Sequence, residues 1–291
     1  MNRRENSLNR KKRTQIALIW RRIKRNKAAV LGFFIVVLYF ITAIFAPYIA
    51  PHDPYDQDLS RNFLPISSKH LLGCDEFGRD LLSRIIYGAR VSLIIQLGAI
   101  IIALTLGVFL GAIGGYYGGK LDEVIMRIMD VLLAFPGMLL ALAIISMLGP
   151  SLKNLIVAIG IYSLPQFARI TRGAVIGVKE NEYIKAAKAI GETNSSIIWR
   201  YVLPNALSPI IVQTTLRMAT VLLTAAGLGF LGLGVQPPTP EWGAMLSNAR
   251  MYLRVAPGVA FFPGLAIMIV VLGFNLFGDG LQDALNPRLK E

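Results

Sequence analysis

The side chains that could do chemistry in this sequence are few and scattered. Cysteine occurs once, as Cys74, and histidine twice, as His52 and His70, so neither an internal disulfide nor a cysteine zinc cluster can form. His70 is close in sequence to Cys74, Asp75 and Glu76, a set that could ligate a metal. We expect these to be ordinary loop residues, and we predict no metal site. No serine–histidine–aspartate set can be assembled, so the sequence predicts no catalytic centre.

A glycine-rich stretch offers one further chemical possibility, a phosphate-binding loop. Gly114, Gly119 and Lys120 follow the spacing of such a loop. However, Leu121 stands where a serine or threonine would bind magnesium, and an apolar run precedes the stretch instead of a strand. We therefore predict that this chain has no nucleotide site and that any ATP it uses is hydrolysed on another chain.

A polar stretch of 26 residues, 180–205, interrupts the long apolar runs. Its pattern predicts two short helices. Asn181 can cap the first helix, and Glu182 follows in the first turn, where the helix dipole favours an acid. Gly191 fits the left-handed residue that ends a helix. Alanines occupy much of this helix, and their small side chains would let another surface approach closely.

The second helix is predicted over residues 197–202, with Ser195 or Thr193 as its cap. Pro204 would end or kink it, because proline cannot continue the helical hydrogen-bond ladder. From the residues alone, the stretch has two interpretations of equal weight. It is either an ordinary connector between two membrane spans or a docking element for a partner.

The order of residues in this stretch resembles the cytoplasmic EAA loop of ABC-importer permeases. The shared pattern consists of Glu182, the alanine pair 186–187, Gly191 and the closing LPN at 203–205. Lys185 departs from that pattern, which usually has glutamate there. The resemblance implies that the loop couples the permease to an ATPase. The residues that the resemblance assigns to this coupling are Glu182, Tyr183, Lys185, Ala186, Ala187, Gly191, Leu203, Pro204 and Asn205.

The rest of the chain is similar to the dipeptide, oligopeptide and nickel permease group over nearly its whole length. The matching segments are 71–90 (LLGCDEFGRDLLSRIIYGAR), 114–119 (GGYYGG), 229–246 (GFLGLGVQPPTPEWGAML) and 274–289 (FNLFGDGLQDALNPRL). This family implies a type I ABC importer transmembrane domain, all-α, with six transmembrane helices and both termini in the cytoplasm. It also implies a second homologous permease, two ATPase subunits that bind ATP and Mg²⁺, and an extracytoplasmic substrate-binding protein.

Composition independently predicts an integral membrane protein. The 291 residues are 54% hydrophobic and only 16% charged, whereas a soluble domain has about 25% charged residues. The net charge of +13 is concentrated in residues 1–27, which hold eleven lysines and arginines against one acid. Because this tail directly precedes a long apolar run, it predicts a cytoplasmic anchor beside anionic membrane lipid and not a nucleic-acid site.

Six membrane spans follow from the apolar runs. They are expected at 28–50, 91–117, 131–152, 154–178, 209–234 and 255–278. The fourth is the weakest, since only 15 uncharged residues separate Lys153 from Arg169. The last five belong to a transport core, 91–282, and a short cytoplasmic tail, 283–291, follows it. In this arrangement 22 basic residues lie on the cytoplasmic side and eight on the outer side. This excess supports a cytoplasmic location for both termini.

The segments between the spans carry further expectations. Residues 51–90 are expected outside, with an amphipathic helix, capped by Asp75, along the outer membrane surface. This helix is either a gate or a simple elbow into the second span. Residues 120–130 are expected to form a charged connector, and 241–252 a short outer helix with Trp242 at the membrane interface.

Glycines and one arginine stand out within the apolar runs. Glycines four residues apart allow close approach of helices in lipid. The candidates for such packing are Gly107, Gly111, Gly114, Gly115 and Gly118. Arg217 lies in the predicted fifth span, where it is either a functional residue or an interfacial one near the inner end.

These observations lead to the hypothesis of a permease subunit of an ATP-driven importer. The resemblance favours dipeptides or oligopeptides as cargo, with nickel and glutathione as alternatives, and the sequence names no cavity-lining residues. Two other classes stay open: a self-sufficient channel or secondary carrier, and a membrane anchor for another enzyme. The lack of ionisable residues in the middle of the predicted spans weakens the hypothesis of a proton-coupled carrier.

Overall fold

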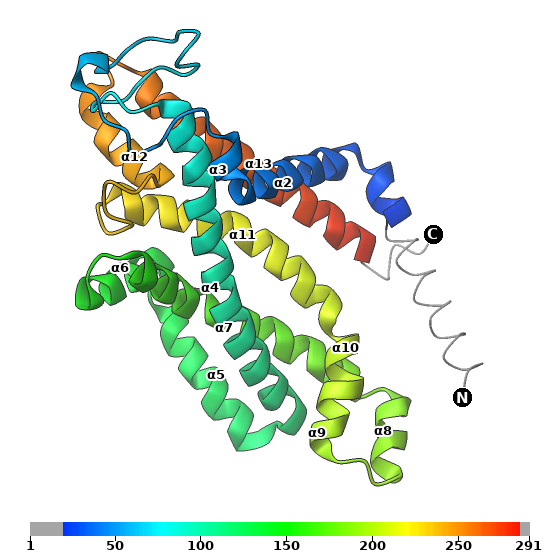
Figure 1. Cartoon of the computed structure of the whole chain (residues 1–291). Helices are drawn as coiled ribbons and strands as arrows, with labels where there is room; N and C mark the ends of the chain where they lie inside the picture. The colour runs from blue at the N-terminus through cyan, green and yellow to red at the C-terminus, as the bar shows by residue number, and fades with distance from the viewer. Residues whose placement is uncertain (1–19, 286–291) are drawn as a thin grey trace.

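The computed structural model describes residues 20–285, and within that range the chain folds into helices without a β-strand. Most of the predicted basic tail (1–27) and most of the predicted tail 283–291 lie outside the described residues. The principal helices are α2 Lys27–Ile44, α3 Ala46–Ile49, α4 Leu81–Tyr117, α5 Gly119–Ala134, α6 Gly137–Leu148, α7 Leu152–Lys179, α8 Glu182–Ala189, α11 Leu207–Phe230, α12 Trp242–Ala249 and α13 Gly258–Leu285. Figure 1 shows these helices crossing one another in an elongated bundle.

Four of the described helices are long and apolar enough to cross a membrane: α2, α4, α11 and α13. The bent pair α5 and α6 adds a fifth if it counts as one span. The helix α7 is 28 residues long but contains Lys153, Arg169 and Arg172. It occupies the region of the predicted fourth span, which was the weakest of the six.

The longest helix, α4, is continuous over 37 residues, or about 55 Å at the usual rise per residue. That length exceeds the roughly 30 Å of a bilayer core, so α4 extends beyond it. The prediction of a separate surface helix capped by Asp75 is therefore wrong. The helix begins at Leu81, because the side chain of Asp80 accepts a hydrogen bond from the Ser83 N–H.

The predicted third span is broken. Residues 120–130, expected as a charged connector, are helical and belong to α5. The chain then turns by 89° between α5 and α6. The break falls at Phe135 and Pro136, where an extended backbone precedes α6. The predicted span 131–152 contains Pro136, which cannot continue a helix, and the structure is interrupted at that residue.

The other spans differ from prediction mainly at their ends. The run 28–50 is divided at Phe45 into α2 and α3, with a proline in the first turn of α3. The helix α11 ends at Phe230 instead of residue 234, and α13 extends past residue 278 to Leu285. Local signals thus located these helices but not their exact termini.

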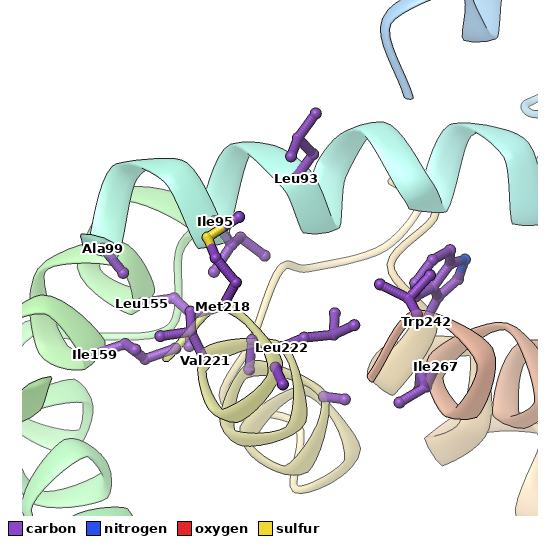
Figure 2. Packing of buried hydrophobic residues seen from close by; sticks show 14 of the residues in the cluster. Leu93, Ile95, Ala99, Leu155, Ile159, Met218, Val221, Leu222, Trp242 and Ile267 are labelled. Carbon is purple, nitrogen blue, oxygen red and sulfur yellow. The ribbon is translucent and has the colours of Figure 1, made fainter. Parts of the chain in front are cut away.

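The core lies where α4, α7, α11, α12 and α13 meet. Its buried side chains include Ile95, Ile159, Leu222, Trp242 and Ile267. Figure 2 shows these residues converging from separate helices onto one apolar cluster. Trp242 is only 2% exposed and its indole N–H donates to the Ile85 carbonyl at 3.0 Å. Trp242 therefore packs inside the bundle, and its place at the membrane interface stays a prediction.

Two smaller units lie at opposite ends of α4 (Figure 1). We call residues 50–80, together with the first turn of α4, the loop cap. We call residues 180–206 the hook. The loop cap surrounds the start of α4, and the hook packs on its last turns through Ala112 and Tyr116. One helix therefore connects both units.

Candidate functional site

The first helix of the hook, α8, begins and ends where the sequence predicted. Asn181 occupies the N-cap position, but its side chain makes no cap bond and instead donates to the Val178 carbonyl at 2.8 Å. Gly191 has a φ of +85°, the left-handed conformation that glycine adopts without strain. The Glu192 N–H bonds to the Ala187 carbonyl beside it, which closes the helix end.

The second helical run of the hook is longer than predicted and passes through a π-helical stretch. It consists of α9 Asn194–Ser196, the π-helix Ile197–Val202 and α10 Leu203–Asn205. Thr193 caps it, since its hydroxyl accepts from the Ser196 N–H at 3.3 Å. Pro204 does not end the run, which continues through Asn205, whose side chain donates to the Tyr201 carbonyl at 2.6 Å.

One face of the hook is buried against the bundle. Ile184 and Ala187 point inward from α8, and Ile197 and Val202 point inward from the second run. They pack with Ala112 and Tyr116 of α4 and with Val175 of α7. One polar contact strengthens this attachment, since the Tyr116 hydroxyl donates to the Asn194 side chain at 2.8 Å. Lys179, at the end of α7, donates to the Gly115 and Tyr116 carbonyls and so joins the two helices that support the hook. The hook is thus firmly held on two helices.

The opposite face of the hook is exposed and partly apolar. Ile190 is 78% exposed, Trp199 48% and Tyr183 43%. Ala186 lies on the same outward side of α8. Exposed aromatic and aliphatic side chains gathered on one unit are typical of a surface that binds another protein.

The predicted coupling residues therefore divide between two environments. Only Ala187 is buried, and Leu203 is partly buried. The remainder are exposed: Glu182, Tyr183, Lys185, Ala186, Gly191, Pro204 and Asn205. Sequence reasoning missed the buried anchor Ile184 and the exposed pair Ile190 and Trp199. The three-residue spacing of Ile184 and Ala187 could have identified the inward face.

The glycines of α4 lie at its contact with α7. A Cβ added at Gly107 would lie 2.6 Å from the Phe167 Cβ, and one at Gly115 would lie 2.9 Å from the Arg172 carbonyl oxygen. Gly111 approaches the Ala168 carbonyl even more closely. Gly114 faces α5 instead, 3.0 Å from the Asp122 carboxylate. Gly118 has open space around it and a φ of +68°, so its predicted packing role is wrong and it ends α4.

The loop cap holds a network of buried charges. The Asp75 carboxylate accepts from the Arg79 guanidinium at 2.7 Å and lies 3.2 Å from that of Arg84. All three side chains are at most 5% exposed. Arg84 also donates to the carbonyls of Pro54 and Pro238, which lie in separate loops. This network fastens distant loops to the start of α4.

A second polar group in the loop cap surrounds Asp80. Its carboxylate lies 2.9 Å from the His70 ring nitrogen Nδ1 and 3.6 Å from that of His52. The Ser83 hydroxyl donates to the same carboxylate at 2.7 Å. Burial alone would raise the pKa of Asp80, but the hydrogen bonds from Ser83 and His70 outweigh it and lower that pKa. The carboxylate is therefore ionised at neutral pH.

Arg217 lies in the interior of α11 and is only 6% exposed, so it is buried against neighbouring helices, and both interpretations of its role stay open. Its guanidinium lies 5.6 Å from the centre of the Tyr162 ring of α7, within the range of a cation–π contact. Its Nε has no hydrogen-bond partner among the described residues. Arg217 thus contributes to the contact between α7 and α11.

The fold and the hook define a multi-pass membrane protein in which a separate helical unit packs on the ends of two long helices. Residues 103–291 match the model of the family described as "Binding-protein-dependent transport system inner membrane component". Residues 14–65 match the N-terminal transmembrane domain of oligopeptide transport permease C. The chain belongs to the family of binding-protein-dependent transport system inner membrane components. It is an ABC transporter permease, a multi-pass protein of the cytoplasmic membrane.

Curated relatives align over almost the whole chain. A dipeptide transport system permease protein of Alkalihalophilus pseudofirmus is 49% identical, over 93% of this chain and 89% of the relative. A di/tripeptide transport system permease protein of Pseudomonas aeruginosa is 47% identical, over 93% of this chain and 91% of the relative. A glutathione transport system permease protein of Escherichia coli is 46% identical, over 93% of this chain and 90% of the relative.

Solved structures support the fold. The MetNI methionine ABC transporter, in an inward-facing conformation, contains a chain with a TM-score of 0.55 and 20% identity, covering 71% of this chain and 98% of that one. An amino acid ABC transporter chain gives a TM-score of 0.54 at 16% identity, covering 68% and 92%. At these identities the likeness concerns the fold alone.

Proposed function

We propose that this permease imports dipeptides or short oligopeptides and that its hook docks on an ATPase subunit in the cytoplasm. The observation that supports docking most directly is the exposure of apolar side chains on both helical runs of the hook: Tyr183, Ala186 and Ile190 beside α8, and Trp199 on the second run. The names of the curated relatives support a peptide cargo, since two transport di- or tripeptides and a third transports glutathione, itself a tripeptide.

The proposed topology has six spans with both termini in the cytoplasm. Four long apolar helices, the bent pair α5 and α6 as one span, and α7 together make six. The hook then lies on the cytoplasmic side and the loop cap on the outer side. The proposed assembly comprises a second homologous permease, two ATPase subunits that hold ATP and Mg²⁺, and an extracytoplasmic substrate-binding protein.

Short connections would transmit movement of the hook into the bundle. Only residues 180–181 separate α7 from α8, and only Ala206 separates α10 from α11. Links this short cannot absorb a displacement of the hook. The contact of Tyr116 with Asn194 adds α4 as a third connected helix. A nucleotide-driven movement of the ATPase would thus shift three long helices together, provided that the ATPase contacts the hook differently in its two states.

The test of docking is ATP-dependent uptake by the complex reconstituted in liposomes. Gly191→Arg should abolish uptake, but its positive φ means that any side chain there also strains the backbone. Ala186→Arg is the sharper variant, because it adds bulk and charge to the outward face of an intact α8. Uptake should be lost while membrane insertion stays normal. Ser195→Arg, exposed on the second run, is the matched control and should retain uptake.

Normal ATP-dependent uptake by Ala186→Arg would contradict the docking role. Uptake by the chain alone, without ATPase subunits or ATP, would instead identify a self-sufficient carrier. Competition by a panel of dipeptides, tripeptides, glutathione and nickel ions then tests the cargo. We expect short peptides to compete, and exclusive competition by nickel would overturn the peptide assignment.

A further inference from the structure

His52, His70 and Asp80 converge in the loop cap from three places in the chain. One potential ligand atom from each residue lies within 4.8 Å of the others. The two imidazole rings are stacked with their centres 4.7 Å apart. We propose that these three side chains bind a divalent transition metal, with Zn²⁺ as the best-fitting ion.

The distances between the ligand atoms fit such an ion. Zinc binds imidazole nitrogen and carboxylate oxygen at about 2.0–2.2 Å in a tetrahedral arrangement, which separates neighbouring ligand atoms by about 3.4 Å. The Nδ1 atoms of His70 and His52 lie 2.9 and 3.6 Å from one oxygen of Asp80. These two values lie on either side of the expected separation, and the ligand nitrogens of the two histidines lie within 4.8 Å of each other.

An unsatisfied nitrogen points independently to a ligand. Nδ1 of His52 is inaccessible to solvent and has no hydrogen-bond partner among the described residues, although the Asp80 carboxylate lies 3.6 Å away. Buried polar atoms usually have a partner. A metal ion between His52, His70 and Asp80 would satisfy this nitrogen.

The surroundings hold the three residues in place. The second oxygen of Asp80 accepts from both the N–H and the hydroxyl of Ser83, so the first oxygen faces the two rings. The Ser83 hydroxyl also accepts from the His52 backbone N–H at 3.0 Å, and the Ser67 hydroxyl accepts from that of His70 at 3.1 Å. Outer-shell partners of this kind orient metal ligands and strengthen binding.

The ligand types select the class of ion. Two imidazoles and one carboxylate suit Zn²⁺, whereas Ca²⁺ and Mg²⁺ prefer sites made of oxygen ligands. Three protein ligands leave a fourth position for water or another ligand. His70 and Asp80 are buried, but the His52 side chain is 34% exposed, which gives the ion a route from solvent. Cys74, the donor suggested by sequence proximity, does not belong to this group.

The test is direct metal binding by the purified full chain in detergent, stripped with chelator and free of any histidine tag. Titration with Zn²⁺, followed by calorimetry or by competition with a chromophoric chelator, should show one saturable site per chain. His52→Ala should weaken binding at least tenfold, and Ser83→Ala about 10–100-fold through the lost outer-shell bonds. Ca²⁺ and Mg²⁺ should not compete.

A matched control separates this site from general binding to acids. Asp56→Ala removes an exposed carboxylate of the same loop and should leave Zn²⁺ affinity unchanged. His52 is partly exposed, so its variant should fold even if a substitution at buried His70 does not. Equal Zn²⁺ binding by the unsubstituted chain and His52→Ala, or no saturable binding at all, would overturn the proposal. Either result leaves the transport function untouched.

Discussion

The loop cap and the hook lie at opposite ends of α4 and differ in which side chains they bury. In the loop cap, one group of charged side chains is buried and paired, as with Asp75 and Arg79, each 3% exposed on its side chain. In the hook, charged residues are exposed, and apolar residues such as Ile190 and Trp199 are exposed with them.

The physical consequence is that the two ends differ in how much they depend on paired buried charges. A buried charge must find its partner within the protein, because leaving it unpaired is strongly destabilising. The loop cap therefore pairs its buried charges internally, while Leu59 and Ile66 on its surface are 71% and 66% exposed. Exposed apolar area gains free energy only when another surface covers it. Both ends expose apolar side chains, so the contrast between them lies in the buried charges of the loop cap and not in exposed apolar area.

The largest expected effect is on the buried charges of the loop cap. Asp75→Ala leaves Arg84 without its carboxylate and Arg79 with only its longer contact to Glu76, and should lower the free energy of unfolding by about 3–5 kcal/mol. Thermal unfolding in detergent measures this effect. Asp58→Ala, which breaks an exposed pair with Arg61, should change stability little. Equal losses of unfolding free energy in the two variants would show that the stability of the loop cap does not depend on its buried ion pairs.

The next effect separates the two faces of α8. Ile184 is fully buried, so Ile184→Ala should destabilise the hook by about 2–5 kcal/mol. Hydrogen exchange over residues 182–205 should accelerate. Tyr183→Ala, on the exposed side, should leave that exchange unchanged while reducing ATP-coupled uptake. Faster exchange in both variants would mean that the outward face also serves the fold.

A smaller effect is expected at the α4–α7 contact that joins the two ends. Gly111→Ala places a methyl group against the Ala168 carbonyl and 2.9 Å from the Thr171 Cβ, which should destabilise the chain by about 1–3 kcal/mol. Gly173→Ala on α7 is the matched control, because nothing lies within 4 Å of its added Cβ. It should be neutral or stabilising. Thermal unfolding that ranks them in the opposite order would contradict this packing.

The last effect depends on pH and concerns Glu241, the cap of α12. Burial raises its pKa to about 7, although the Gly243 and Ala244 N–H groups lower it. Because the folded-state pKa exceeds the usual value, Glu241 contributes stability at low pH that is lost as pH rises towards 7. The stability difference between the native chain and Glu241→Gln should fall by about 1.4 kcal/mol per pH unit between pH 5 and 7. Unfolding of both proteins at four pH values measures this stability difference. A difference that stays constant with pH would contradict the raised pKa of Glu241.

The sequence predicted the helical membrane architecture and much of the hook, because those signals are local. Long uncharged runs require helices in a bilayer, where every backbone group must bond internally. Gly191 ended α8 and Thr193 capped the next run, as expected from residue type. Gly107 and Gly111 were correctly expected to face another helix, although the sequence did not identify α7.

Only the tertiary structure decided which residues meet across the chain. It brought His52 beside His70, buried Trp242 against α4, and placed Arg217 over Tyr162. It also set the 89° bend between α5 and α6. Membrane helices that are apolar on all sides do not reveal which face has a neighbour. Composition therefore determined that these helices form, whereas packing determined how they are arranged.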